Sequence, residues 1–296
     1  MPNIGFIGLG NMGAPMAANL VKSGDRVAGF DLAVALRQAC AEQGVEIAPN
    51  AKATVEQADV VITMLPAGEH VRAVWTDVLP SAKPGALFID CSTIDVTSAR
   101  AAHALAAARG IAALDAPVSG GVTGAKAASL TFMVGGSAEA FARGKPILER
   151  MGKRVVHCGD AGNGQAAKIC NNMILGASMI VVSEAFVLGE KLGLSHQALF
   201  DVASASSGQC WSLTSYCPVP GPVPASPANN GYRPGFAASL MLKDLKLARD
   251  AAQAVHADNA LGGHAAEIYA QFADAGHGAS DFSGIINFVR ERLNRR

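Results

Sequence analysis

The stretch NIGFIGLGNMG, residues 3–13, decides the fold class of this chain. Its first six residues form a short apolar run typical of a buried strand, and a helical pattern follows as far as Lys22. Between them, Gly8 permits a tight turn, Gly10 lets the backbone approach a pyrophosphate, and Gly13 lets the helix pack closely on the strand. Free N–H groups at the start of that helix can then hold phosphates. The stretch therefore predicts a dinucleotide-binding strand–loop–helix unit.

A carboxylate at the end of the next apolar run supports this interpretation. RVAGFD (Arg26–Asp31) is typical of a second strand, and Asp31 follows Gly13 by eighteen residues. An Asp at this point accepts hydrogen bonds from the adenosine ribose and repels a 2′-phosphate, which favours NAD over NADP. The alternative is that Asp31 only caps the following helix. The pattern predicts NAD as cofactor, bound by Gly8, Gly10, Asn11, Met12, Gly13 and Asp31.

Short apolar runs alternate with Ala-rich helical stretches through the first half of the chain. Such alternation indicates an α/β fold with a parallel, doubly wound, Rossmann-like sheet. The runs after the first two strands are 60–65, 86–91 and 111–116, with 130–136 and 154–159 extending the sheet.

The alternation stops near Gly164, and the rest of the chain is helical. We expect a long interdomain helix over about 165–192, then helices within 195–206 and 235–257, and a last helix from Phe282 to Arg295. The prediction is an NAD-binding domain over 1–163 and an all-helical domain over 164–296. Between the later helices, residues 217–235 hold six of the fourteen prolines and cannot form a helix. This segment is either an exposed connector or an active-site rim.

Composition narrows the class of protein. The 296 residues are 50% hydrophobic and 16% charged with a formal net charge of zero, which suits a well-cored protein and argues against nucleic acid as a partner. Six scattered cysteines without ligand spacing argue against a metal site and fit a reducing cytosol. The N-terminus lacks the pattern of a signal peptide, and polar residues interrupt the most apolar helix, so we expect a cytoplasmic protein without a membrane span.

The stretch GQAAKICNN, residues 164–172, puts a lysine at the start of an apolar helix. Lys168 and Asn172 are four residues apart, so they share one helix face. A lysine there, where the helix dipole disfavours positive charge, is expected to have a lowered pKa, as a general acid/base requires. The alternative is a lysine that snorkels to the surface.

Other parts of the sequence add less. Ser119-Gly120-Gly121 follows a predicted strand and offers backbone N–H groups for a carboxylate, although an ordinary turn is the simpler interpretation. No G-x-S-x-G elbow, P-loop or histidine ligand pair appears, which argues against hydrolases and NTPases. Trp211 could line an apolar pocket, but packing in the helical core is its default.

Four stretches together resemble the β-hydroxyacid dehydrogenase family, and most of all its 3-hydroxyisobutyrate dehydrogenase branch. They are GFIGLGNMGAPMAANL, DAPVSGGVTGA, GNGQAAKICNNM and GFAASLMLKDLKLA, and they follow the family's order over nearly the whole chain. The chain differs from the family at Gln209 and Cys210, where relatives usually read Gly-Asn. The resemblance implies a Rossmann domain, a long interdomain helix and a helical domain that forms homodimers or homotetramers.

The resemblance also implies roles for individual residues. Lys168 matches the catalytic lysine and Asn172 the asparagine of the same motif, while Ser119, Gly120 and Gly121 match the segment that binds the substrate carboxylate. Trp211 is then a substrate-binding candidate. The cofactor contacts of the family fall on Leu65, Pro66, His70, Thr93 and Lys243.

The activity implied is the NAD-dependent oxidation of 3-hydroxyisobutyrate to methylmalonate semialdehyde, a step of valine degradation, with Lys168 as general acid/base. The alternatives are another family member acting on serine, tartronate semialdehyde or another short β-hydroxyacid or semialdehyde, and, from a different class, a non-catalytic NAD-binding module. Lys168 and Asn172 argue against the last, because a binding module has no need of a costly lysine there.

Overall fold

The structure, a computed structural model, describes residues 1–294 and divides into two compact units. One unit is Met1–Lys168 and the other is Ile169–Arg296. The division lies inside helix α8 (Asn163–Lys191), whereas the sequence-based boundary lies at its beginning.

Unit 1 contains a largely parallel sheet. The six strands β3-β2-β1-β4-β5-β6 are parallel neighbours in that order, which is the doubly wound Rossmann arrangement. The prediction of a Rossmann-like domain is therefore confirmed. One feature differs from it, because β8 joins β6 in the antiparallel direction and β9 then pairs with β8 in parallel. The strands are β1 (Asn3–Ile7), β2 (Arg26–Phe30), β3 (Glu46–Ile47), β4 (Val60–Thr63), β5 (Leu87–Asp90), β6 (Ala112–Asp115), β7 (Val118–Ser119), β8 (Leu130–Gly135) and β9 (Gly152–Gly159).

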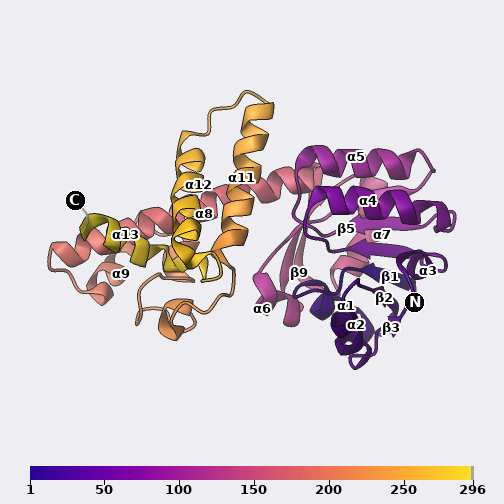
Figure 1. Ribbon diagram of the computed structural model, residues 1–296, viewed down its shortest axis with the longest axis horizontal. Coiled ribbons are helices and arrows are strands. Elements are labelled where there is room, and N and C mark those ends of the chain that lie inside the picture. Colours follow the sequence, from indigo (N-terminus) through magenta and orange to yellow (C-terminus); the bar gives the residue numbers. More distant parts are fainter. Residues whose placement is uncertain (295–296) are drawn as a thin grey trace. The chain divides into compact units, whose positions relative to one another are not determined.

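The register of the central strands separates two hydrophobic cores. Phe6, Ile62, Ile89 and Leu114 are aligned across four strands and point into one core, while their neighbours in each strand point into the other. Because both faces of the sheet are apolar, helices must cover both. Figure 1 shows α4 and α5 on one face and α1 and α2 on the other. The helices are α1 (Gly13–Lys22), α2 (Val34–Ala41), α3 (Ala51–Val55), α4 (Gly68–Val78), α5 (Val96–Ala107), α6 (Gly121–Lys126) and α7 (Ala138–Leu148).

Unit 2 is helical. Its main core gathers Met179, Tyr269, Phe272 and Phe282 from three different segments, each at most 2% exposed. Helices α11 and α12 lie side by side (Figure 1). Helix α12 was not predicted from the sequence, and the predicted end of the last helix, Arg295, lies outside the described residues. After α8, the helices are α9 (His196–Ser204), α10 (Trp211–Thr214), α11 (Ala238–Ala254), α12 (Ala260–Phe272) and α13 (Ile285–Asn294).

The proline-rich segment 217–235 is not an exposed connector along its whole length. Cys217 and Val219 are fully buried in the second core of unit 2. The Ser226 hydroxyl donates to the Cys217 carbonyl at 2.6 Å, and the Tyr232 hydroxyl donates to the Pro218 carbonyl at 2.9 Å. Its regular structure is one 3₁₀ turn, Pro227–Asn230. The segment packs as a compact loop because its own polar groups satisfy its buried carbonyls.

Helix α8 is long and apolar enough, by length and composition, to cross a membrane. Half of the most apolar 18-residue stretch of this helix is buried inside the protein. The core helix of a soluble protein passes the same test, so α8 is weak evidence for a membrane span.

Candidate active site

The glycine loop between β1 and α1 has the geometry that a bound pyrophosphate requires. Gly8 has φ +97°, and a Cβ built on it would lie 2.2 Å from the Met64 carbonyl oxygen. A Cβ on Gly13 would lie 1.9 Å from the Gly8 carbonyl oxygen, so both positions require glycine. A Cβ on Gly10 would meet nothing within 4 Å, which leaves room for a ligand at that point. No side chain caps the N-terminus of α1, and this end of the helix therefore fits a dinucleotide phosphate.

Asp31 is anchored to the glycine loop. Its Oδ2 accepts a hydrogen bond from the Leu9 N–H at 2.8 Å, and its Oδ1 accepts from the Ala33 N–H at 2.8 Å. Helix α2 begins after Ala33 without a side-chain cap, so the alternative that Asp31 caps this helix is wrong. The carboxylate is held beside the loop in an orientation that suits a ribose diol.

Three polar side chains lie next to one another at the carboxyl ends of the central strands. Thr63, Asp90 and Asp115 are aligned in register on β4, β5 and β6. Asp90 Oδ1 accepts from the Thr63 hydroxyl at 2.7 Å and from the Ser92 hydroxyl at 2.6 Å. Burial raises the pKa of the Asp90 carboxyl to about 7, against the opposing effect of these hydrogen bonds.

The predicted cofactor contacts lie on the loops after these strands. Leu65 and Pro66 follow β4, and Thr93 follows β5. The Leu65 N–H donates to the Ser92 hydroxyl at 2.8 Å, so the two loops are bonded directly to each other. His70 is exposed in the first turn of α4.

The start of α8 is tied to the same strand ends. The Asp115 carboxylate accepts from the Gly162 N–H at 2.8 Å and from the Gln165 N–H at 2.9 Å, and His103 Nε2 lies 3.0 Å from it. The Gln165 side chain bonds to the loop after β5 on both sides of Thr93. Lys168 follows one turn later and is 7% exposed, so the alternative of a surface-snorkelling lysine is wrong.

Ser119 and the two glycines after it form a short turn between β7 and α6. Ser119 is half-buried at the end of β7, in register with Thr131. Gly120 has φ +133° and Gly121 has φ +60°, conformations that favour glycine at both positions.

Asn172 belongs to unit 2, where its amide is held by a carboxylate. Its Nδ2 donates to Asp244 Oδ2 at 2.5 Å, and its Oδ1 accepts from the Asn171 amide at 2.9 Å. Asn172 is 1% exposed and Asp244 is 4% exposed. Lys243, the predicted cofactor contact next to Asp244, has its Nζ 3.7 Å from Asp244 Oδ1. The Asp244 carboxylate therefore sets the orientation of the Asn172 amide.

Trp211 is not a core residue, and its default assignment to the helical core is wrong. The residue is 51% exposed at the start of α10. Its indole stacks on the Tyr216 ring, with centroids 4.9 Å apart and an interplanar angle of 21°, and Tyr216 stacks on Phe282. The exposed face of the indole is thus supported from behind by two further rings.

The buried polar residues that hold the site together were not among the predicted site residues. Asp90, Ser92 and Gln165 support the loops of unit 1, and Asp244 orients Asn172. A local signal existed for two of them, since Asp90 lies near the end of the predicted strand 86–91 and Gln165 begins the predicted helix of Lys168. The Gln165 side chain meets its partners 71 and 73 residues away, and Asp90 meets Thr63 27 residues away, so no local pattern reports these contacts.

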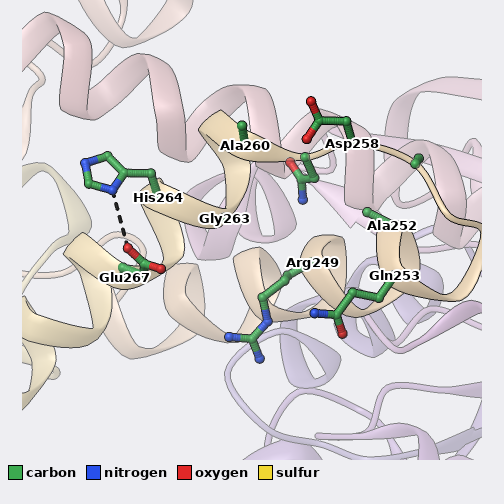
Figure 2. A pocket seen from close by; sticks show the side chains of 10 residues that line it. Arg249, Ala252, Gln253, Asp258, Ala260, Gly263, His264 and Glu267 are labelled. Atoms are coloured by element: carbon green, nitrogen blue, oxygen red, sulfur yellow. Dashed lines mark hydrogen bonds and ion pairs between the residues drawn. The ribbon is translucent and has the colours of Figure 1, made fainter.

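A hollow within unit 2 involves none of the predicted residues. Figure 2 shows this hollow between the end of α11 and the start of α12, with a volume of about 450 Å³. Among the described residues, no group of three or more histidine, cysteine or acidic side chains could hold a metal ion. The hollow is lined by Arg249, Ala252, Gln253, Ala257, Asp258, Asn259, Ala260, Gly263, His264 and Glu267.

Comparison with known proteins extends the description of both units. Residues 3–159 match the NAD-binding domain of 6-phosphogluconate dehydrogenase, and residues 162–289 match the NAD-binding family of NADP-dependent 3-hydroxyisobutyrate dehydrogenase. A probable 3-hydroxyisobutyrate dehydrogenase of Mycobacterium tuberculosis is 57% identical, over 99% of this chain and 100% of that protein.

L-serine is named with two of the similar proteins, once as a substrate and once as a bound molecule. An NAD-dependent L-serine dehydrogenase of Pseudomonas aeruginosa is 46% identical over 96% of both chains. A solved structure of the Mycobacterium tuberculosis 3-hydroxyisobutyrate dehydrogenase with L-serine has a TM-score of 0.95 and 57% identity, covering 98% of this chain and 99% of that one. From these matches over both units, the chain belongs to the 3-hydroxyisobutyrate dehydrogenase family, and it is an NAD-binding oxidoreductase that acts on a small hydroxyacid.

Proposed function

We propose that this protein oxidises 3-hydroxyisobutyrate to methylmalonate semialdehyde with NAD, as a step of valine degradation. The observation that carries the proposal is the buried Lys168, one helical turn before the buried Asn172 on α8. A lysine at this depth is costly unless its ammonium has a chemical or structural use. Full-length similarity to 3-hydroxyisobutyrate dehydrogenases supports the substrate.

Each proposed role follows from the local chemistry. Bound NAD supplies a hydride acceptor for the carbon of the alcohol. Lys168 takes the hydroxyl proton during oxidation and returns it during reduction, which is general acid/base catalysis. Ser119, Gly120 and Gly121 hold the substrate carboxylate through a hydroxyl and backbone N–H groups. Asn172 orients the substrate with the amide that Asp244 positions.

We propose the remaining predicted residues for cofactor and substrate binding. The residues that would hold the pyrophosphate are Gly8, Gly10, Asn11, Met12 and Gly13. Those that would contact other parts of the dinucleotide are Leu65, Pro66, His70, Thr93 and Lys243. Trp211 borders the substrate.

Asp31 supports the preference for NAD over NADP. Its carboxylate is anchored at both oxygens to backbone N–H groups, so it cannot turn away from a 2′-phosphate without losing them. A 2′-phosphate bound beside this carboxylate would be repelled by its like charge, whereas ribose hydroxyls would donate hydrogen bonds to it.

Oxidation of L-serine is the second candidate. Serine carries the same primary alcohol and carboxylate and replaces a methyl group with an ammonium. The relative named L-serine dehydrogenase and the relative solved with L-serine favour it.

We further propose that residues 164–296 form a substrate and oligomerisation domain in a cytoplasmic homodimer or homotetramer. Ile174, Val181 and Leu188 lie seven residues apart on α8 and are 60–65% exposed. Such a stripe of large apolar side chains on one helix is typical of a surface that another copy covers.

The test is a panel of short hydroxyacids with NAD, followed by NADH absorbance at 340 nm, with the Lys168→Ala protein as the blank. The panel contains both enantiomers of 3-hydroxyisobutyrate, L-serine, D-glycerate and 4-hydroxybutyrate. We expect the highest kcat/KM for a 3-hydroxyisobutyrate enantiomer. A higher value for L-serine would make the second candidate the function. No turnover of any member would refute both candidates and leave another short β-hydroxyacid or semialdehyde as the substrate, or a non-catalytic NAD-binding module.

A further inference from the structure

The Gln165 side chain forms a two-point clamp on the loop after β5. Its Nε2 donates to the Ser92 carbonyl at 2.7 Å, and its Oε1 accepts from the Ile94 N–H at 3.1 Å. The side-chain amide thus donates one hydrogen bond to the loop backbone and accepts one from it, as a neighbouring β-strand would. Thr93 lies between the two contacts. Gln165 is fully buried, so water cannot replace either bond.

The clamped loop is bonded in turn to the neighbouring strand ends. The Ser92 hydroxyl accepts from the Leu65 N–H and donates to Asp90, which also accepts from Thr63. On the other side, Asp115 accepts from the backbone of Gln165 itself. The loops after β4 and β5, the end of β6 and the first turn of α8 therefore form one buried hydrogen-bonded network.

Lys168 moves with this network because it lies three residues after Gln165 on the same helix. An α-helix transmits a displacement of its first turn to the next, and small displacements of a catalytic group have large effects on rate. We propose that Gln165 is a positioning residue, which holds Lys168 and the loop of Thr93 in one geometry, and this inference rests on the proposed role of Lys168.

The amide has two properties that ordinary substitutes lack. Methionine has a similar length and volume but bonds to neither the Ser92 carbonyl nor the Ile94 N–H. Ionised glutamate accepts from Ile94 but repels the Ser92 carbonyl. Protonated glutamic acid has one donor and one acceptor, so it can replace the amide in both bonds. Burial and the Asp115 carboxylate both favour this neutral form.

The experiment compares the wild-type holoenzyme with Gln165→Met and Gln165→Glu across pH 5.5–8.5. We expect Gln165→Met to lower kcat roughly tenfold to a hundredfold at every pH, with KM within about threefold of wild type. For Gln165→Glu, we expect the ratio of its kcat to that of the wild type to rise at least about fivefold as the pH falls. Other titratable groups lie on the elements that the clamp joins, namely Asp90, Cys91, Asp95, His103, Asp115 and Lys168. Because these groups are present in both proteins, dividing the kcat of the variant by that of the wild type removes their common effect on the pH profile.

Hydrogen exchange supplies a readout that does not depend on turnover. We expect the Ile94 amide to be protected in the wild type, exposed in Gln165→Met, and protected in Gln165→Glu only at low pH. The matched control is Gln197→Glu, which adds the same charge at an exposed amide on α9 that donates to Asp201 at 2.7 Å. Its kcat ratio is expected to stay flat with pH.

Three results would overturn the proposal: a Gln165→Met protein with kcat within twofold of wild type, a flat pH ratio for Gln165→Glu, or a protected Ile94 amide in Gln165→Met. A merely structural role would lower the folded fraction without changing the pH dependence of kcat per folded molecule. If the wild type turns over no hydroxyacid, the proposed function fails, and the exchange of Ile94 still decides whether the clamp exists.

Discussion

The buried carboxyl of Asp90 makes the stability of unit 1 depend on pH. Its carboxyl is 2% exposed, and its folded pKa is about 7 against an ordinary value of 3.8. The folded state therefore binds the proton more tightly than the unfolded state does. The stability associated with the protonated form is present below about pH 4 and is lost as the pH rises toward 7. A difference of about three pKa units at 1.36 kcal/mol each corresponds to about 4 kcal/mol.

Asp90→Asn removes the free-energy cost of keeping an ionised carboxylate buried, and it keeps the acceptor at Oδ1 for the Thr63 and Ser92 hydroxyls. Relative to wild type, we expect the variant to gain about 1 kcal/mol in unfolding free energy at pH 4.5 and about 4 kcal/mol at pH 7.5. The assay is urea unfolding followed by the fluorescence of Trp75, whose indole N–H donates to the Thr63 hydroxyl at 3.2 Å. A Trp211→Phe background removes the other tryptophan, so the signal reports unit 1 alone.

Asp59→Asn is the matched control with the opposite sign. Asp59 is half-buried, and the Lys83 ammonium, followed by the Asn3 N–H, lowers the pKa of its carboxyl. Its loss should reduce stability at neutral pH, and the reduction should fade as the pH falls. An Asp90→Asn advantage that stays constant between pH 4.5 and 7.5, or that is absent, would refute the argument from burial.

Three further predictions concern the proposed site. Lys168→Ala is expected to lower kcat roughly a hundredfold or more while the Kd for NAD, measured by fluorescence titration, stays within about threefold; turnover at the wild-type rate would contradict general acid/base catalysis. Asp31→Asn keeps an acceptor for the glycine loop but loses the charge, so the Kd for NADP should fall about tenfold; an unchanged ratio of NADP to NAD affinity would show that this carboxylate does not select the cofactor. Gly13→Ala should lose roughly 1–3 kcal/mol of stability in thermal unfolding because its Cβ would clash with the Gly8 carbonyl, whereas Gly10→Ala, in open space, should keep its stability and lose NAD affinity; equal melting temperatures for the two variants would contradict these assignments.

Local signals were sufficient for the architecture of unit 1 and for most of the helices. Apolar runs of strand length and the spacing of glycines reflect steric limits within a few residues, so they can be read without the fold. The same signals failed where burial depends on distant partners. The short strands β3 and β7 and the helix α12 were not predicted, and β8 was expected to extend a parallel sheet but joins β6 in the opposite direction.

The sequence by itself determined the dinucleotide loop, the acidic residue after β2 and the pairing of Lys168 with Asn172 on one helix face, because each depends on spacing along a single element. Only the tertiary structure decided what holds these residues in place. Gln165 meets its partners on Ser92 and Ile94 across more than 70 residues, and Asn172 meets Asp244 across 72. Buried polar groups need partners wherever the fold supplies them, and that requirement leaves no periodic trace in the chain.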